Sequence, residues 1–305
     1  MSLVASLLER TSRTFALSIP MLPMPTQREI AVAYLLFRVA DTFEDEPWWD
    51  LPERIEGLRG LAIAVGDHAS EHNFTPPAPR AGVETHDGYA ELLDQSSAVL
   101  GAWRELDPDA ARSIAKHLIR TIDGMAAHLE RGQAPRTIPE VQRYCYYVAG
   151  IVGELCTDLF WRAAPEGAPP RARAELDQLA GTFGEGLQLV NILRDEHMDA
   201  DDGRCFLPDD ADRRELFSIA ATDLDAACRY VGILETAGFD PGIVAFNALN
   251  TLLAIRTLAL VREQGAGAKL GRDEVGRIVK DVQAAATART ARELLADAAR
   301  GVPAS

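Results

Sequence analysis

Hydrophobic residues recur at helical spacing along almost the whole chain of 305 residues. Apolar positions three and four residues apart mark one face of a helix, whereas a half-buried strand would alternate apolar and polar residues. No segment shows sustained alternation with β-branched residues, so the pattern predicts no sheet. The predicted helices span residues 4–10, 27–44, 52–67, 86–105, 108–132, 141–163, 172–200, 212–235, 241–264 and 272–299.

The predicted helix 27–44 is apolar around most of its circumference, which indicates a central position in a helical bundle. Thr26 and Glu29 have the spacing of a capping box at its start, and Pro47 follows its end. The connections between the helices are short and no internal repeat is visible. We therefore expect one all-α domain over residues 1–305.

The longest apolar segment lies within the predicted helix 241–264. It contains Asn247, Asn250 and Arg256, and such polar residues make it a poor membrane span. The first residues carry no basic leader of the kind that directs export. We expect a buried helix here and a protein of the cytoplasm.

Charge and cysteine content exclude several functions. The formal net charge of −15 argues against a nucleic-acid partner and disfavours tight electrostatic attachment to anionic lipid. The four cysteines form no C-x-x-C pair and no cluster with histidine, which favours reduced, buried thiols over disulfides or a zinc site.

A polar stripe runs along the predicted helix 172–200. It consists of Gln188, Asn191, Asp195 and Asp199, which follow one another at spacings of three and four. Asp195 and Asp199 lie one turn apart, so their carboxylates can converge on a hard cation such as Mg²⁺ while a substrate phosphate completes its shell. Taken alone, the stripe also fits a solvated acidic helix face.

A second acidic cluster ends the predicted helix 27–44. It consists of Arg38, Asp41, Glu44 and Asp45, which we expect to share one face. Carboxylates on an apolar helix are costly to bury unless they are paired or bound to metal, although they also fit the solvated end of a helix. Two such clusters favour several Mg²⁺ ions around one diphosphate, whose departure would leave an allylic carbocation sheltered by apolar and aromatic walls.

Five blocks of sequence, in this order and spacing, resemble the squalene/phytoene synthase family. They are SRTFALSIPMLP (12–23), YLLFRVADTFEDE (34–46), YCYYVAGIVG (144–153), LQLVNILRDEHMDADDGRCFLP (187–208) and, more weakly, FNALNTLLAIRTL (246–258). The resemblance implies a prenyltransferase with the all-α isoprenoid synthase fold and a central prenyl cavity. It also implies Mg²⁺, with Mn²⁺ as an alternative, and a prenyl diphosphate as the partner.

The resemblance implies roles for residues by position. The implied metal ligands are Asp41, Glu44, Asp45, Asp195 and Asp199. The implied diphosphate contacts are Ser12, Arg13, Arg38, Arg194 and Arg204, where the guanidinium fork suits phosphate or orients a carboxylate. The implied polar contacts leading into the second motif are Gln188 and Asn191. Arg194 and Arg204 also fit a purely structural role as ion-pair partners of the nearby aspartates.

Aromatic residues match positions that line the prenyl cavity in the family. They are Phe15, Tyr34, Tyr144 and Phe246. Tyr144 resembles the tyrosine that assists ionisation or proton removal. Ordinary core packing, with the tyrosine hydroxyl bonded to nearby backbone, explains the same residues without any function. The small residues of 149–153 likewise fit either close helix packing or room for an isoprenoid tail.

The motifs DTFEDE and YCYYVAG are more similar to squalene synthases than to phytoene synthases. This implies that two farnesyl diphosphates condense through presqualene diphosphate to squalene, and GRCFLP resembles the loop near which squalene synthases bind NADPH. Three alternatives stay open: a dehydrosqualene or phytoene synthase without reduction, a terpene synthase that ionises a single prenyl diphosphate, and a non-catalytic prenyl-binding homologue.

The chain departs from the family in the second acidic motif, where Met198 stands in place of a glutamate. Asn247 and Asn250 replace residues that are usually apolar or proline. We also expect no membrane-anchoring helix of the kind that ends eukaryotic squalene synthases, although oily products make transient membrane contact an expectation of this function.

Overall fold

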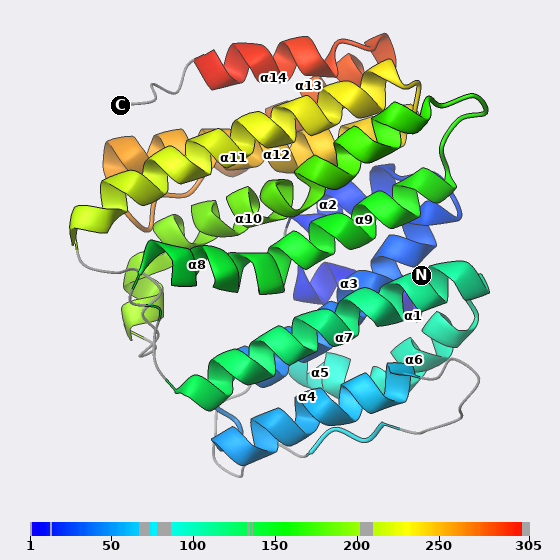
Figure 1. Cartoon of the computed structure of the whole chain (residues 1–305), viewed down its shortest axis with the longest axis vertical. Coiled ribbons are helices and arrows are strands. Elements are labelled where there is room, and N and C mark those ends of the chain that lie inside the picture. Colours follow the sequence, from blue (N-terminus) through cyan, green and yellow to red (C-terminus); the bar gives the residue numbers. More distant parts are fainter. Residues whose placement is uncertain are drawn as a thin grey trace. The chain divides into compact units, whose positions relative to one another are not determined.

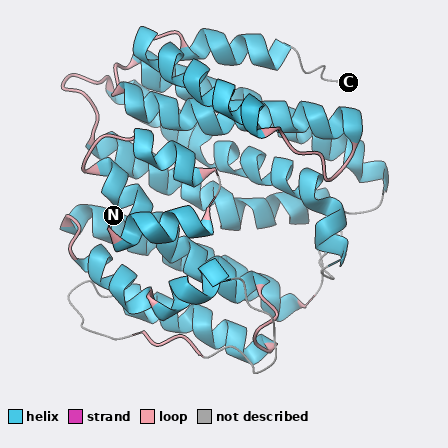
Figure 2. Ribbon diagram, turned by 180° about the vertical axis from the view of Figure 1, so that it is seen from behind, coloured by secondary structure: helices cyan, strands magenta, loops and turns pink. Residues whose placement is uncertain are grey.

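A computed structural model describes residues 2–12, 14–66, 74–77, 87–132, 135, 137–201 and 210–300, without the side chains of residues 87, 198–201 and 210–212. Every element in these ranges is helical (Figures 1 and 2), which confirms the predicted all-α class. The elements are α1 (Leu3–Thr11), α2 (Phe15–Ser18), η1 (Ile19–Met21), α3 (Thr26–Asp45), α4 (Leu51–Gly66), α5 (Asp87–Asp94), α6 (Ser96–Arg104), α7 (Pro108–Arg131), α8 (Ile138–Cys145), η2 (Tyr146–Gly150), α9 (Ile151–Arg162), α10 (Pro170–Asp201), α11 (Asp210–Thr236), α12 (Pro241–Gln264), α13 (Arg272–Ala288) and α14 (Ala291–Arg300).

The helices form two compact units. Unit 1 comprises residues 1–20 and 24–133, and unit 2 comprises residues 21–23 and 134–305. Each unit has its own buried apolar residues. The expectation of a single domain stays a prediction.

Helix α3 is the centre of unit 1, where it packs against α1, α4, α5, α6 and α7. Its apolar circumference explains this position, because Val32, Leu35 and Phe43 are fully buried. The predicted capping box is wrong. Pro25 already has near-helical backbone angles and Thr26 is buried inside the first turn, so no side chain caps this end.

Helix α10 has the corresponding place in unit 2, packed against α8, η2, α9, α11 and α12 (Figure 1). Two glycines permit its close approach to η2 and α9. A Cβ added to Gly153 would lie 2.1 Å from the Ala180 carbonyl oxygen, and one added to Gly184 would lie 2.1 Å from the Ala149 oxygen. These glycines therefore serve helix packing.

Three predicted helices are interrupted in the structure. The segment 86–105 breaks at Gln95, and the segment 272–299 breaks where Arg289 adopts a left-handed conformation at φ 58°. The segment 141–163 contains the π-helix η2, in which the Ile151 amide donates to the Tyr146 carbonyl five residues back. A π-turn within an α-helix is rare and frequent at functional sites.

Helix α12 is the one element within the described residues that is long and apolar enough to cross a membrane, and most of it is buried inside unit 2. Its buried amides bond within the helix. Asn247 Nδ2 donates to the Ile243 carbonyl at 2.8 Å, and Asn250 Nδ2 donates to the Phe246 carbonyl at 2.9 Å. Each buried amide group thus has a hydrogen-bond partner, and the burial of α12 confirms the predicted buried helix.

Candidate functional site

The first acidic motif lies on the last turns of α3, as the sequence predicts. Asp41 and Asp45 are one turn apart and both are half-exposed, whereas Glu44 is buried. All three lie on the same helical turns, as the expected common face requires, but they differ in exposure.

Arg38 is held in place by an aromatic pair and by Asp41. Its guanidinium lies 5.6 Å from the ring centres of both Tyr34 and Tyr89, and Nη1 lies 3.4 Å from Asp41 Oδ2. Tyr34 in turn donates its hydroxyl to the Thr11 carbonyl at 2.8 Å. The pKa of Arg38 is raised on balance, because the effect of Asp41 and the two tyrosines outweighs that of burial.

The pKa of Asp41 is raised to about 6, because burial, with a smaller contribution from Asp45, outweighs the lowering effect of Arg38. The two aspartates thus present hard oxygen donors that repel each other, and a divalent cation between them would remove the repulsion. Asp41 and Asp45 therefore fit Mg²⁺. Among the described side chains no three acidic, histidine or cysteine groups gather into a complete metal site, so further ligands would come from a substrate or from undescribed residues.

The start of the chain supplies further predicted residues to unit 1. Ser12 Oγ accepts from the Phe15 amide at 2.9 Å, and the Phe15 ring packs on Tyr34 with 5.3 Å between centres. Phe15 and Tyr34 therefore belong to the same group as Arg38. Arg13 lies outside the described residues.

The predicted polar stripe is present on α10. Gln188, Asn191 and Asp195 are all half-exposed. The residues between them are buried, namely Leu189, Val190, Ile192 and Leu193. Asp199 lies on the same helix, but its side chain and that of Met198 are not described, and Arg204 lies outside the described residues.

Asp195 is paired with its neighbour. Arg194 Nε and Nη2 donate to the two carboxylate oxygens of Asp195 at 2.8 and 2.5 Å, which fits the structural role of this arginine, while its contact with diphosphate stays a prediction. The Gly267 amide donates to the Arg194 carbonyl at 2.6 Å, which ties the loop before α13 to this part of α10. Glu196 is bound instead to Arg213 at 3.0 Å.

Tyr144 and Phe246 are both buried in unit 2. Tyr144 is the second-last residue of α8, just before the π-helix. The Phe246 ring meets Phe160 edge to face with 5.7 Å between centres. This packing fits a core aromatic, and the cavity-lining role of both residues stays a prediction.

A group of acidic residues in unit 2 was missed by the sequence analysis. Tyr146 donates its hydroxyl to Glu154 Oε1 at 2.8 Å. Burial raises the pKa of Glu185, with a contribution from Glu154, and raises that of Asp223 to about 7, with a contribution from Glu185. The residues come from η2, α9, α10 and α11, so no local sequence pattern links them.

The pKa of Asp223 gives a prediction for stability. In the folded protein the carboxyl keeps its proton up to about pH 7, whereas the unfolded chain releases it near pH 4. Between these values the unfolded state binds fewer protons, so stability falls as pH rises. Asp223→Asn should therefore stabilise the protein, and by about 2–3 kcal/mol more at pH 8 than at pH 5. Urea unfolding at both values measures this, and equal effects at the two pH values would contradict it. Asp225→Asn, at an exposed site on α11, is the control.

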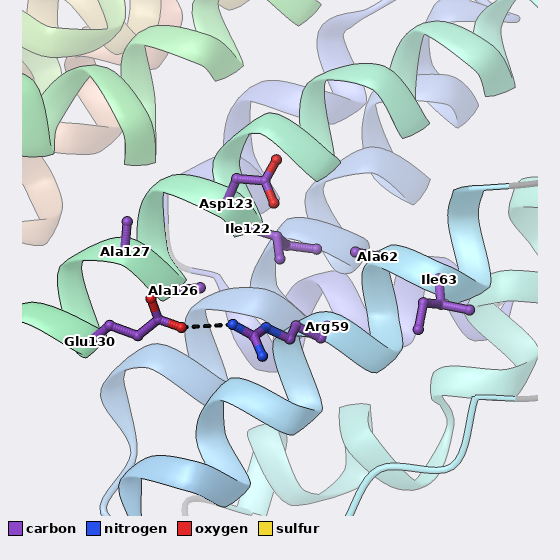
Figure 3. A pocket seen from close by; sticks show the side chains of 8 residues that line it. All are labelled: Arg59, Ala62, Ile63, Ile122, Asp123, Ala126, Ala127 and Glu130. Atoms are coloured by element: carbon purple, nitrogen blue, oxygen red, sulfur yellow. Dashed lines mark hydrogen bonds and ion pairs between the residues drawn. The ribbon is translucent and has the colours of Figure 1, made fainter.

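A separate pocket of about 370 Å³ opens between α4 and α7 in unit 1. Arg59 and Glu130 form an ion pair at 2.7 Å on its wall, and the side chain of Ile63 is largely exposed beside it (Figure 3). Its lining contains none of the predicted site residues. The predicted central prenyl cavity is thus a different feature and stays a prediction.

Comparison with known protein families identifies the family to which this chain belongs. A family model described as "Squalene/phytoene synthase" matches residues 8–224. The chain belongs to the squalene/phytoene synthase family. This membership confirms the resemblance carried by the five sequence blocks and places the chain among prenyltransferases.

Relatives in this family include squalene synthases from several eukaryotes. The squalene synthase of Schizosaccharomyces pombe is 28% identical over 283 residues, which cover 84% of this chain and 58% of the relative. The probable squalene synthase of Neurospora crassa is 32% identical over 206 residues, covering 66% of this chain and 40% of the relative. The chain thus spans about half the length of the curated relatives that it matches.

Solved structures of the family share the fold. A ligand complex of TcSQS has a TM-score of 0.76 with 21% identity and covers 98% of both chains. A dehydrosqualene synthase in complex with ligand has a TM-score of 0.59 with 20% identity, covering 93% of this chain and 95% of the other. The likeness confirms the isoprenoid synthase architecture.

Proposed function

We propose that the protein joins two farnesyl diphosphates head to head in a Mg²⁺-dependent reaction that passes through presqualene diphosphate to squalene. The observation that carries the proposal is the half-exposed pair Asp41 and Asp45, set at the end of an otherwise buried helix. Membership of the squalene/phytoene synthase family and similarity to squalene synthases give this pair its chemical meaning.

The metal ligands in this proposal are Asp41 and Asp45 in unit 1 and Asp195 and Asp199 in unit 2. Bound Mg²⁺ would supply positive charge that stabilises the departing diphosphate. Glu44 is the third proposed ligand of the first motif, and it is buried.

Arg38 is the residue that we expect to bind the diphosphate directly. Its position between two tyrosine rings leaves the guanidinium few alternative orientations, and Asp41 keeps it charged. A fixed planar fork of N–H donors suits phosphate oxygens. Arg13 and Arg204 complete the phosphate contacts by family position, and Arg194 orients Asp195.

Tyr144 assists ionisation or accepts a proton by family position. Its side chain is buried at the end of α8, next to the π-helix. Phe15 and Tyr34 supply aromatic faces that stabilise a carbocation. Gln188 and Asn191 orient the substrate along the polar stripe of α10.

We propose NADPH as the reductant of the final step, on the similarity to squalene synthases. The protein would act in the cytoplasm with transient contact to the membrane that receives its product. A dehydrosqualene-type reaction without reduction is the second candidate, because a dehydrosqualene synthase shares the fold.

Product masses test the proposal. The purified protein is incubated with farnesyl diphosphate and Mg²⁺, with and without NADPH. We expect squalene when NADPH is present and presqualene diphosphate or dehydrosqualene when it is absent. Fifteen-carbon products alone would indicate a terpene synthase, and no turnover would favour a prenyl-binding homologue. Either result would contradict the proposal.

A further inference from the structure

The polar stripe of α10 extends beyond the predicted motif. Glu185 lies three residues before Gln188, and it is half-exposed like Gln188, Asn191 and Asp195. The residues packed on the other sides of this segment are buried, among them Phe183 and Leu189. Glu185 therefore belongs to the same accessible face as the second acidic motif, at its far end.

The separation along this face matches the size of a prenyl chain. Glu185 and Asp195 are ten residues apart in the sequence, which corresponds to about 15 Å of helix. An extended fifteen-carbon chain whose diphosphate is bound at Asp195 would reach approximately to Glu185. Apolar side chains would be expected at that point, because hydrocarbon contact strips water from polar groups.

The carboxyl of Glu185 is not isolated. Asp223 of α11 faces it across the helix interface, where a Cβ on Gly186 would lie 2.7 Å from the Asp223 Cβ. On the other side, a Cβ added to Gly150 would lie 2.7 Å from the Tyr146 ring and 3.4 Å from the Glu185 Cγ. Tyr146 is in turn bonded to Glu154. Four polar side chains from four elements thus surround the end of the stripe.

Asp223 adds a second carboxyl to that of Glu185 in this group. The residue is 9% exposed. Burial raises the pKa of Asp223, and the nearby carboxyl of Glu185 raises it further. The carboxyl oxygens of Asp223 are not among the fully enclosed side-chain atoms of the described residues that lack a partner, so water or a polar ligand group can lie beside them.

We propose that Glu185, supported by Asp223, forms a polar end-stop for the prenyl tail that limits the substrate to about fifteen carbons. A farnesyl tail ends before the carboxyls and leaves their water in place. The twenty-carbon geranylgeranyl tail covers them, displaces that water and leaves both groups without hydrogen bonds. This inference rests on the proposed function, because it takes Asp195 as a diphosphate site.

The test is the preference for farnesyl over geranylgeranyl diphosphate, measured as the ratio of the two kcat/KM values. Glu185→Leu should lower this ratio at least about tenfold, mainly by improving the KM for the longer substrate, since the effect lies in binding the tail. Asp223→Asn should lower it by a smaller factor. Glu175→Leu, at an exposed position earlier on α10, should leave it unchanged.

A binding measurement separates this inference from the proposed function. Calorimetry with the unreactive farnesyl and geranylgeranyl thiolodiphosphates gives the same affinity ratio even if the protein turns over neither substrate. A ratio that Glu185→Leu leaves within twofold of the unsubstituted protein would overturn the end-stop, as would failure of the folded protein to bind either analogue. Loss of thirty-carbon product with a shifted affinity ratio would instead overturn the proposed reaction alone.

Discussion

Asp41→Asn should reduce diphosphate release from farnesyl diphosphate at least about 100-fold, which corresponds to roughly 3 kcal/mol of transition-state stabilisation. Asparagine keeps the shape of the side chain but removes the negative charge that a Mg²⁺ ligand supplies at this position. It also releases Arg38 from its carboxylate partner, so both the metal and the diphosphate contact are weakened. A phosphate-release assay at saturating Mg²⁺ measures the loss.

Protein stability distinguishes this effect from unfolding. Burial raises the pKa of Asp41 to about 6, which shows that its charged form is disfavoured in the folded protein. Asp41→Asn should therefore leave the melting temperature unchanged or raise it. Glu56→Gln, at an exposed position of α4, is the control for activity. Full activity of Asp41→Asn would refute the metal role of this residue.

Gly184→Ala should have the largest effect on stability, about 3 kcal/mol or more. Its Cβ would lie 2.1 Å from the Ala149 carbonyl oxygen and 2.9 Å from the Gly150 amide, and these backbone atoms cannot move aside as a side chain can. Relief of the clash requires separation of α10 from η2. Thermal and urea unfolding measure the loss.

Gly276→Ala is the matched control for this substitution. Gly276 also lies inside a helix of unit 2, on α13, but no atom lies within 4 Å of an added Cβ. Alanine should stabilise the protein there by about 0.5–1 kcal/mol, because it favours the helix over the unfolded chain. Equal effects at the two glycines would show that α10 and η2 are not in close contact.

The helices were predictable because their signal is local. Apolar spacing along the chain located α3, α10 and α12, whose packing faces are repeated every turn. The breaks at Gln95 and Arg289 and the π-helix were not predictable in the same way. Each is a change of backbone conformation at one or a few residues inside a continuous apolar pattern, and neighbouring helices decide whether it is tolerated.

The site was predictable to the extent that its residues lie close together in the sequence. Asp41 with Asp45, and Gln188 with Asn191 and Asp195, share helix faces by spacing alone. Burial was not predictable by the same rule, since Glu44 lies only three residues from Asp41 and yet is buried, whereas Asp41 is half-exposed. The orientation of α3 within unit 1 determines that difference.

Contacts between distant segments were missed altogether. Tyr89 covers the guanidinium of Arg38 from a helix some fifty residues later in the sequence. The group around Glu185 likewise depends on the register of α10 against α11 and η2. Neither register follows from a single sequence, because many registers satisfy the same apolar pattern.

The central claim, that two prenyl diphosphates are joined, is tested most directly with a mixture of substrates. The purified protein is incubated with Mg²⁺, NADPH and equal amounts of unlabelled and fully deuterated farnesyl diphosphate, and the products are analysed by mass spectrometry. We predict thirty-carbon hydrocarbon in three mass classes: unlabelled, labelled in one half, and labelled in both halves. Products in which no molecule combines a labelled and an unlabelled farnesyl unit would contradict the account.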